Sequence, residues 1–348
     1  MAGVTRRTPC FFHEDQLRFR PRYEWALGKK IDHPERTERA DRILAALQND
    51  ATRFDVRAPD ETEPIELVTR QHAPRLLRLY ETAADLDENR EYHPSVFMRR
   101  NGVDPDPTNI HHAGYFCFDS GTPLTREARE AALRSAACAI AAATTLREQR
   151  EGLVYSLSRP PGHHASYDSF GGYCYVNNTA LAARVLRRGG RVAVLDVDVH
   201  HGNGTQSLFW EDGDVLTVSV HGDPSDTFPY FSGKASENGQ GPGRDRNMNV
   251  PLPSGTDGQA YARALERTVL PCIRAFEPSA LVVAAGVDAY RDDPIGNFDL
   301  TTEDFHRIGE LIGRLRVPTC AVQEGGYYTP KIGDNVVALL DGLRAGLG

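Results

Sequence analysis

The feature of this sequence that most constrains its fold is a series of short, almost wholly apolar runs, each followed by glycine and polar residues. Such runs are typical of strands in a parallel sheet, because helices cover both faces of that sheet and bury every side chain. Longer stretches with helical periodicity separate the runs. The sequence therefore predicts a single α/β domain over residues 1–348, with a mostly parallel, multi-stranded sheet and helices on both faces.

The periodicity also places the individual elements. We expect strands at residues 10–13, 153–157, 191–197, 215–220, 280–284 and 319–322, and helices near residues 34–48, 125–149, 177–188, 257–276, 302–315 and 335–346. Thr301 and Asp304 resemble a capping box at the start of the fifth helix. Two segments, 86–124 and 222–256, are crowded with Gly, Pro, Asn and Asp, and we expect them to be loops that rim a site.

Polar motifs stand at the carboxyl ends of five expected strands. They are RPPGHHA, DVDVHHGNGT, SVHGD, GVDAY and QEGGYY, which begin at residues 159, 196, 219, 286 and 323. In open parallel sheets, ligands bind just outside these ends. We therefore expect one active site at the C-terminal ends of the strands.

A metal site is the strongest expectation from these motifs. Side chains two apart on an extended segment face the same way, so Asp198 and His200 could share a ligand. Histidine and carboxylate suit zinc or another first-row divalent ion. Asp288 is the expected third ligand, because an acid directly after a buried strand is otherwise costly to bury. The alternatives are a hydrogen-bonded Asp–His pair, and an ordinary turn or helix-cap role for Asp288.

Two further motifs carry candidate catalytic groups. His163 and His164 stand in a Pro-Gly frame, and histidine is the usual general acid or base near neutral pH. Tyr327 follows a Gly-Gly pair, and its phenol could donate a hydrogen bond to a developing oxyanion. Structural histidines and an ordinary half-buried tyrosine are the alternatives at this point.

Composition and charge narrow the classes of partner. A formal net charge of −8 argues against a general nucleic-acid binder. No apolar run approaches the ~18 residues that cross a bilayer, so we expect no membrane association. The first residues lack the apolar core of a secretory leader, and the expected location is cytoplasmic. Six cysteines without a C-x-x-C pair argue against a thiolate zinc site and a disulfide framework.

Taken together, the motifs resemble those of the histone deacetylase and acetylpolyamine amidohydrolase family, which has an arginase-like fold. The resemblance covers most of the chain, and the chain is most similar to the class II-like bacterial and acetylpolyamine branch. Six motifs carry it in the family's order: RPPGHH (159–164), GGYCYVNN (171–178), LDVDVHHGNGTQ (195–206), SVHGDP (219–224), GVDA (286–289) and EGGY (324–327).

The resemblance implies a role for each residue of the site. The implied zinc ligands are Asp198, His200 and Asp288, with Fe²⁺ as another metal to consider, and the implied catalytic residues are His163, His164 and Tyr327. Asp196 would orient His163, and Asn203 stands where some family members have an aspartate beside the second histidine. The resemblance also implies a substrate tunnel lined by Gly172, Tyr173 and Phe228, and a structural potassium ion held by Asp196, Asp198, His200 and Ser219.

The expected activity is hydrolysis of an N-acetyl amide on a long primary alkylamine, either an acetylpolyamine or an acetyl-lysine peptide. The positions at which polyamine enzymes carry acids that grip a cationic tail fall here on Ile110 and Gly121, which departs from that branch. Two alternatives are a ureohydrolase of the same fold with two manganese ions and a catalytically silent module that binds acylated ligands. The tandem histidines and the EGGY tyrosine argue against the ureohydrolase, and the intact set of site residues argues against the silent module.

The resemblance also implies a homodimer or homotetramer, with the segment 86–124 near the tunnel mouth.

Overall fold

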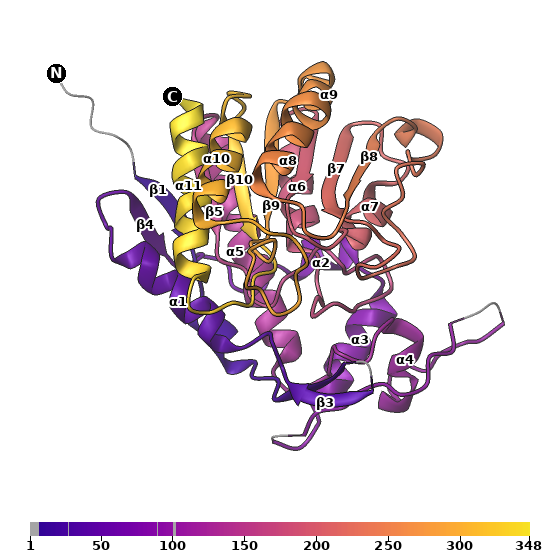
Figure 1. Ribbon diagram of the computed structural model, residues 1–348. Coiled ribbons are helices and arrows are strands. Elements are labelled where there is room, and N and C mark those ends of the chain that lie inside the picture. Colours follow the sequence, from indigo (N-terminus) through magenta and orange to yellow (C-terminus); the bar gives the residue numbers. More distant parts are fainter. Residues whose placement is uncertain (1–6, 27, 89, 100–101) are drawn as a thin grey trace.

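The apolar runs form the interior of one sheet of eight strands, and every neighbouring pair of strands is parallel (Figure 1). The computed structural model describes residues 7–26, 28–88, 90–99 and 102–348. The expectation that the first residues are not a secretory leader falls partly on residues 1–6, which lie outside this part. The strands lie in the order β4-β1-β5-β10-β9-β6-β7-β8. Their bounds are β1 Thr8–Phe11, β4 Phe54–Arg57, β5 Leu153–Ser156, β6 Val192–Asp196, β7 Val215–Gly222, β8 Asn247–Leu252, β9 Ala280–Ala285 and β10 Thr319–Gln323.

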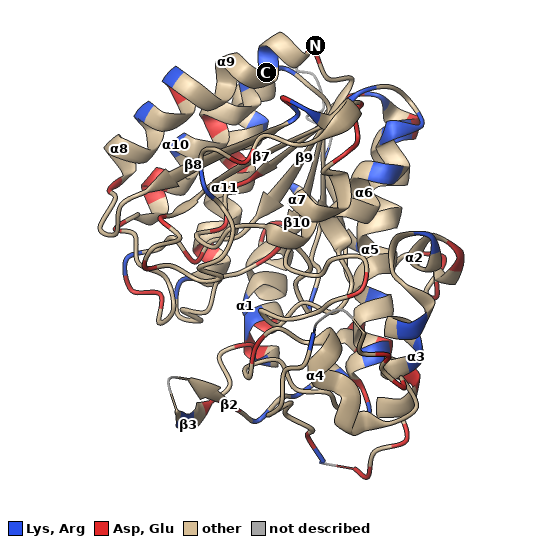
Figure 2. Cartoon of the chain, turned by 90° about the vertical axis from the view of Figure 1, so that its right-hand side faces the viewer, with Lys and Arg blue, Asp and Glu red and all other residues tan. Residues whose placement is uncertain are grey.

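Helices cover both faces of the sheet, as Figure 2 shows with the sheet between the two layers. On one face lie α1 (Thr37–Gln48), α8 (Gly258–Ala264), α9 (Leu270–Phe276), α10 (Thr302–Gly313) and α11 (Ile332–Leu347), and on the other lie α5 (Ala128–Gln149) and α6 (Asn178–Arg187). Successive strand residues enter opposite cores: Leu281 and Val283 of β9 belong to one buried cluster and Val282 to the other. The predicted single α/β domain is confirmed.

The elements that the sequence analysis did not predict are short or lie at the edges of the sheet. Both edge strands, β4 and β8, were missed, and β8 lies inside the segment 222–256 that was expected to be a loop. Edge strands are half exposed, so their sequences are polar, and Pro251 is tolerated in β8 because an edge leaves some N–H groups unpaired. The other missed strands and α-helices are the antiparallel hairpin of β2 (Tyr23–Ala26) and β3 (Lys29–Asp32), and the helices α2 (Ile65–Gln71), α3 (Pro74–Ala83), α4 (Ala113–Phe116) and α7 (Asn203–Phe209).

The predicted helix over residues 257–276 is interrupted. A π-turn at Leu265–Val269 separates α8 from α9, directly before Pro271 in α9. Proline has no N–H group to donate to the preceding turn, which favours such an irregularity. By contrast, the predicted capping box is confirmed: the Thr301 side chain accepts from the Asp304 N–H, and the Asp304 carboxylate accepts from the Thr301 N–H.

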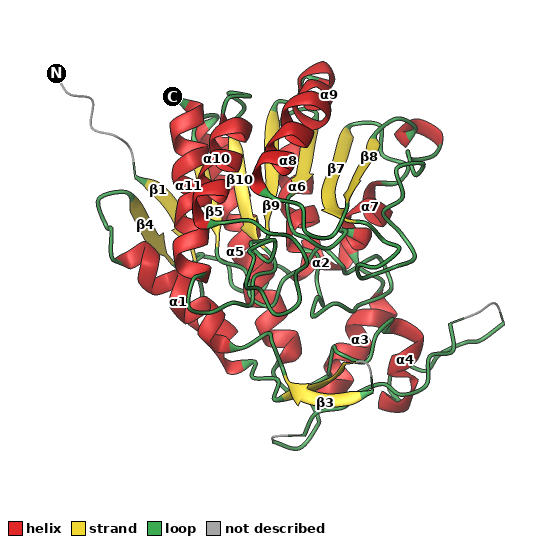
Figure 3. Ribbon diagram, in the orientation of Figure 1, coloured by secondary structure: helices red, strands yellow, loops and turns green. Residues whose placement is uncertain are grey.

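Long loops gather at the carboxyl ends of the strands (Figure 3), as the motif positions predicted. Below these ends in Figure 1 lie the β2–β3 hairpin and the helices α3 and α4, which form an additional layer on that side. All six cysteines fall in the described part of the chain, and each is unpaired. Within the described residues, no helix combines the length and apolar character needed to cross a membrane.

Candidate active site

Four neighbouring strands bring the predicted side chains together. The loops that follow β5, β10, β9 and β6 carry, in that order, the pair His163 and His164, then Tyr327, then Asp288, and the pair Asp198 and His200. All six side chains are buried. Because parallel strands end at the same edge of a sheet, residues more than a hundred positions apart in the chain meet here.

Asp198, His200 and Asp288 form a compact cluster of potential metal-ligand atoms. One such atom from each residue lies within 4.8 Å of the others. His200 Nδ1 is 3.2 Å from Asp198 Oδ1 and 3.1 Å from Asp288 Oδ2. Backbone groups orient the two acids, since the Gly325 N–H donates to Asp198 Oδ2 (2.8 Å) and the Val199 N–H donates to Asp288 Oδ1 (2.9 Å).

The chemistry of this cluster fits a divalent first-row metal. Two buried carboxylates share one imidazole, and burial together with the neighbouring Asp198 charge raises the pKa of Asp288 to about 6. A cation between the acids would offset this repulsion. The nitrogen and oxygen donors match zinc, and three protein ligands leave a position open for water or substrate. The turn also packs tightly on the acids: a Cβ atom at Gly325 would lie 2.1 Å from Asp288 Oδ2.

The tandem histidines have opposite electrostatic environments. His163 Nδ1 is 2.9 Å from Asp196 Oδ2, and although burial disfavours its charged form, Asp198 and Asp196 together raise the pKa of His163 to about 10. Burial and the neighbouring His163 charge lower the pKa of His164 well below its usual value. The two rings lie 4.0 Å apart. The surroundings therefore favour the charged form of His163 and the neutral form of His164.

A hydrogen bond defines the tautomer of the neutral ring. His164 Nδ1 lies 2.6 Å from Asn203 Oδ1. Because an amide oxygen only accepts hydrogen bonds, His164 Nδ1 carries the proton and Nε2 keeps a free lone pair. Asn203 thus contacts the second histidine, and Asp196 contacts the first, at the positions that the sequence analysis expected.

Aromatic side chains and a glycine in the left-handed conformation surround these groups. The Tyr327 and Tyr173 ring centroids lie 5.6 Å apart, and those of His164 and Phe228 lie 5.1 Å apart. Gly172 has a positive φ of 55°, and a Cβ atom there would lie 2.2 Å from the His164 ring. The predicted tunnel residues therefore adjoin the two histidines or the tyrosine beside them, and both Tyr173 and Phe228 are half buried.

The residues of the predicted potassium site lie on β7, at the end of β6 and in the loop that follows β6. Ser219 of β7 is paired with Asp196 of β6 in the sheet register. Its hydroxyl lies 2.8 Å from His221 Nδ1, and Asp196 Oδ1 accepts the Asp198 N–H at 3.1 Å. The fourth member of that set, His200, follows two residues after Asp198.

Sequence analysis missed an acid near the aromatic residues. Glu24 of β2 is 6% exposed, and its Oε2 accepts a hydrogen bond from the Tyr173 hydroxyl at 2.9 Å. A Cβ atom at Gly121 would lie 2.5 Å from that same oxygen, so the carboxylate occupies the space that a side chain at Gly121 would need. Ile110 is half buried and supplies no charge. No local pattern marks Glu24, because only the fold of the hairpin brings it to Tyr173.

A second group of potential ligand atoms comprises His163, Cys174 and Glu324. Each is already hydrogen-bonded within the protein. Glu324 accepts from the Gly162 N–H (2.6 Å) and the Thr179 hydroxyl (2.6 Å), and the Cys174 thiol faces the Gly172 carbonyl oxygen at 3.3 Å. Burial raises the pKa of the Cys174 thiol well above its usual value. We interpret this group as the support of the RPPGHH loop rather than a metal site.

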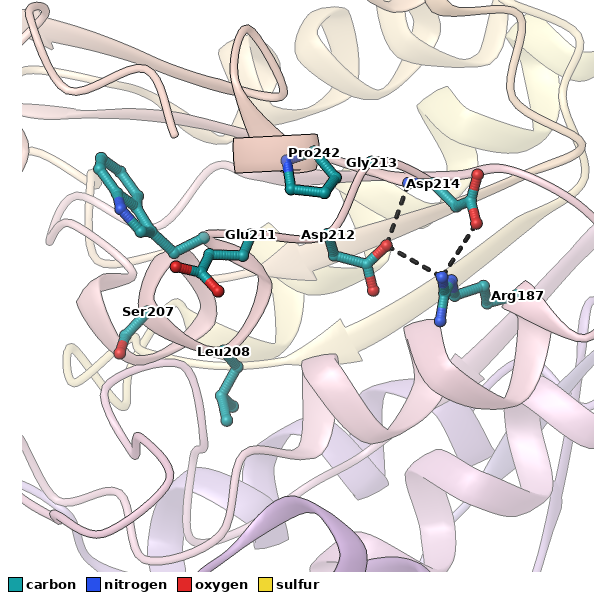
Figure 4. Close-up of a pocket in the computed structure, with 9 residues that line it drawn as sticks. Arg187, Ser207, Leu208, Glu211, Asp212, Gly213, Asp214 and Pro242 are labelled. Carbon is teal, nitrogen blue, oxygen red and sulfur yellow. Dashed lines mark hydrogen bonds and ion pairs between the residues drawn. The ribbon is translucent and has the colours of Figure 1, made fainter. Parts of the chain in front are cut away.

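A wide surface pocket of about 720 Å³ lies elsewhere (Figure 4). Its lining includes Arg187 at the end of α6 and the residues that lead into β7. The pocket therefore lies at the amino end of β7, away from the predicted site. Arg187 forms ion pairs with Asp212 (3.1 Å) and Asp214 (2.9 Å). None of the predicted site residues lines this pocket, and its one arginine is engaged by two of its three acids.

Comparison with known proteins agrees with the motif resemblance. The family model described as "Histone deacetylase domain" matches residues 33–343. Acetylpolyamine amidohydrolase 2 of Pseudomonas aeruginosa is 38% identical over 340 residues, covering 96% of this chain and 98% of that protein. Acetylpolyamine amidohydrolase of Mycoplana ramosa is 40% identical over 339 residues, with coverage of 95% and 98%.

Solved structures show the same similarity. The crystal structure of acetylpolyamine aminohydrolase from Burkholderia pseudomallei superimposes with a TM-score of 0.91 at 37% identity, covering 97% of this chain and 99% of that chain. The crystal structure of the HDA15 HD domain superimposes with a TM-score of 0.81 at 28% identity.

Proposed function

Because this chain belongs to the histone deacetylase family, we propose that it is a zinc-dependent deacetylase that hydrolyses the acetyl amide of acetylated polyamines. A deacetylase-type hydrolase is the function common to the relatives named above. The observation that carries the zinc assignment is the buried cluster of Asp198, His200 and Asp288, whose ligand atoms lie within 4.8 Å of one another. A divalent metal held there would polarise the amide carbonyl and acidify water.

The chain's own residues would move the protons. Neutral His164 accepts a proton through Nε2 from the water that attacks the acetyl carbon, and delivers a proton to the amine nitrogen as the C–N bond breaks. The Asp196 carboxylate, 2.9 Å from His163 Nδ1, favours the charged form of His163, which would stabilise the negative charge that develops. The products are acetate and the free amine.

Tyr327 would stabilise the substrate's carbonyl oxygen as it becomes negative. Burial raises the pKa of Tyr327 well above its usual value, although the Arg39 charge opposes the shift, so the phenol keeps its proton and can donate. Its ring lies beside that of Tyr173, on the side of the site that also holds Glu24. The apolar faces of Tyr173 and Phe228 suit the methylene groups of an alkylamine.

The position of Glu24 supports a substrate with a second, cationic amine. Burial raises the pKa of Glu24, and the nearby Asp119 charge adds to this, although the Tyr173 hydrogen bond opposes it. A carboxylate in this setting gains from an ammonium group close by. The acid missing at Gly121 is thus replaced by one from the hairpin, whose carboxylate fills the space beside it.

The test of the proposed function is kcat/KM on acetylputrescine, acetylspermidine, acetylcadaverine and an acetyl-lysine peptide, with zinc-loaded protein and Asp288→Ala as the blank. We expect the free acetylpolyamines to exceed the peptide by tenfold or more, which corresponds to about 1.4 kcal/mol of transition-state stabilisation. Preference for the peptide would make the protein a lysine deacetylase. Absence of turnover on all four would refute the deacetylase assignment.

Replacing Glu24 by Gln is expected to separate charged from neutral substrates. The amide keeps the shape and can still accept from Tyr173, but it removes the negative charge. We expect kcat/KM for acetylspermidine to fall about tenfold, or roughly 1.4 kcal/mol, while that for uncharged N-butylacetamide stays within about twofold because it offers no second amine. Equal losses on both substrates would mean that Glu24 acts only through Tyr173.

We also propose that the chain forms a homodimer or homotetramer. Val96, Phe97 and Met98 are consecutive and 64%, 44% and 43% exposed, and Trp25 and Ile31 of the hairpin are 45% and 40% exposed. Consecutive exposed apolar residues such as those at 96–98 are typical of association surfaces. Light scattering is expected to give the mass of two or four chains, and Phe97→Glu should shift it to one. A single-chain mass for the unchanged protein would remove the proposal.

A further inference from the structure

The turn that carries Tyr327 is held from two sides by buried charged groups. On one side lies Arg39 of α1, which is 1% exposed, and on the other lies Asp293, which is 7% exposed and follows β9. We propose that Arg39 and Asp293 are positioning residues that fix the Tyr327 hydroxyl where the substrate oxyanion forms. The proposal deepens the proposed function and rests on it.

Arg39 holds the carbonyl side of the turn. Its Nη2 donates to the Glu324 carbonyl oxygen at 2.6 Å, and its Nε donates to the Gly326 carbonyl oxygen. The guanidinium carbon also lies 4.5 Å from the centroid of the Tyr327 ring. The N–H donors of a planar guanidinium have fixed directions, so Arg39 orients the two carbonyl groups of the turn. Its contact with the Tyr327 ring also sets the tilt of that ring.

Asp293 holds the amide side of the same turn. Its Oδ2 accepts from the Tyr327 N–H at 2.7 Å and from the Tyr328 N–H at 3.1 Å, while Oδ1 accepts from the Ile295 N–H at 3.2 Å. The turn itself needs this support. Gly326 has a positive φ of 125°, a backbone conformation without regular hydrogen-bond partners, so the side chains of Arg39 and Asp293 provide the partners instead.

Arg39 is itself held by ion pairs on the side away from the site. Its Nη1 lies 2.8 Å from Glu35 Oε1, and the other oxygen of Glu35 lies 2.9 Å from Arg159 Nη2. A buried ion cluster of this kind is a poor way to gain stability alone, because desolvating the charges costs about as much as their attraction returns. Its geometric effect on the turn is therefore the better account of the buried Arg39 charge.

The test is a double-mutant cycle. Arg39→Lys and Asp293→Asn are each made in the unchanged protein and in a Tyr327→Phe background. Arg134→Lys is the matched control, because Arg134 is also a buried arginine with ion pairs, to Asp15 and Glu130, and its helix α5 covers the opposite face of the sheet from α1. kcat and KM on acetylspermidine, the zinc content and the unfolding temperature are measured for every variant.

We expect each substitution to lower kcat by roughly 10- to 100-fold with KM within about twofold, since a misplacement of about 1 Å has effects of this size. Zinc content should stay at the unchanged level, and Arg134→Lys should keep its kcat. In the Tyr327→Phe background, the same substitutions should change kcat by less than about twofold, because the group they position is gone.

If Arg39→Lys or Asp293→Asn lowers kcat by the same factor in the Tyr327→Phe background as in the unchanged protein, the proposal is overturned. A loss of kcat that follows from a loss of zinc would also overturn it. Asp293→Asn is nearly isosteric, so it keeps the test decisive if Arg39→Lys does not fold. Lack of turnover in the unchanged protein would instead refute the proposed function, which keeps the two failures distinguishable.

Discussion

Asp288→Ala is expected to remove the metal and to lower kcat/KM for acetylspermidine by at least about 10³-fold, or roughly 4 kcal/mol. The carboxylate is one of only three ligand-bearing side chains in the cluster within the described residues, and its loss leaves one acid and one imidazole, too few for tight zinc binding. Elemental analysis of the dialysed protein and steady-state kinetics measure the two effects together.

The control for this substitution is Asp257→Ala. Asp257 caps α8 by accepting from the Ala260 N–H at 2.7 Å and lies outside the site, so its loss should cost roughly 1 kcal/mol of stability while metal content and kcat/KM stay unchanged. The unchanged protein should contain one zinc ion per chain. Two manganese ions per chain would favour the ureohydrolase alternative, and an Asp288→Ala protein that retains zinc would contradict the ligand assignment.

Tyr327→Phe is expected to lower kcat by roughly 10²- to 10³-fold with KM within about threefold, since one hydrogen bond to a developing oxyanion contributes about 2.7–4 kcal/mol. The loss should fall on kcat because the hydrogen bond strengthens only as the carbonyl oxygen becomes negative. Zinc content and unfolding temperature should not change, since Phe fills the same space beside Tyr173.

Tyr328→Phe is the matched control for that experiment. It removes a hydroxyl from the neighbouring residue, whose ring stacks on Tyr290 at a centroid distance of 5.6 Å and is not part of the site. Its kcat should match that of the unchanged protein. If Tyr327→Phe also matched it, the oxyanion role would be excluded, and an inert unchanged protein would favour the silent binding module.

The two experiments report on adjoining parts of one structure. Gly325 donates its N–H to Asp198, so the turn that carries Tyr327 also contacts an acid of the proposed metal site. Measuring zinc content in the tyrosine variant therefore separates loss of the oxyanion hydrogen bond from loss of the metal. The same measurement makes the cycle with Arg39 and Asp293 interpretable.

The local sequence contains enough information to place the central elements. β5, β6, β7, β9 and β10 were each predicted to within two residues at either end, because strands buried on both faces are apolar throughout. The start of α10 followed from the Thr301 capping box, which depends on residues only three positions apart. The edge strands β4 and β8 were missed because half-exposed strands resemble loops in composition.

The residues of the candidate site also divide into those that the local sequence identifies and those that it does not. Asp198 and His200, His163 and His164, and the EGGY tyrosine were identified because each belongs to a short motif whose residue types suit metal binding or proton transfer. Glu24, Arg39 and Asp293 were not, because nothing in their local sequence distinguishes them from ordinary surface or turn residues.

What the sequence by itself determined is therefore the buried strands, the position of each motif at a strand end, and the chemistry of the groups delivered there. The tertiary structure alone decided which strands are neighbours, and hence that Asp288 reaches His200 across 88 positions and Arg39 reaches Gly326 across 287. Periodicity and propensity act over a few residues, whereas these contacts depend on how distant segments pack against the sheet.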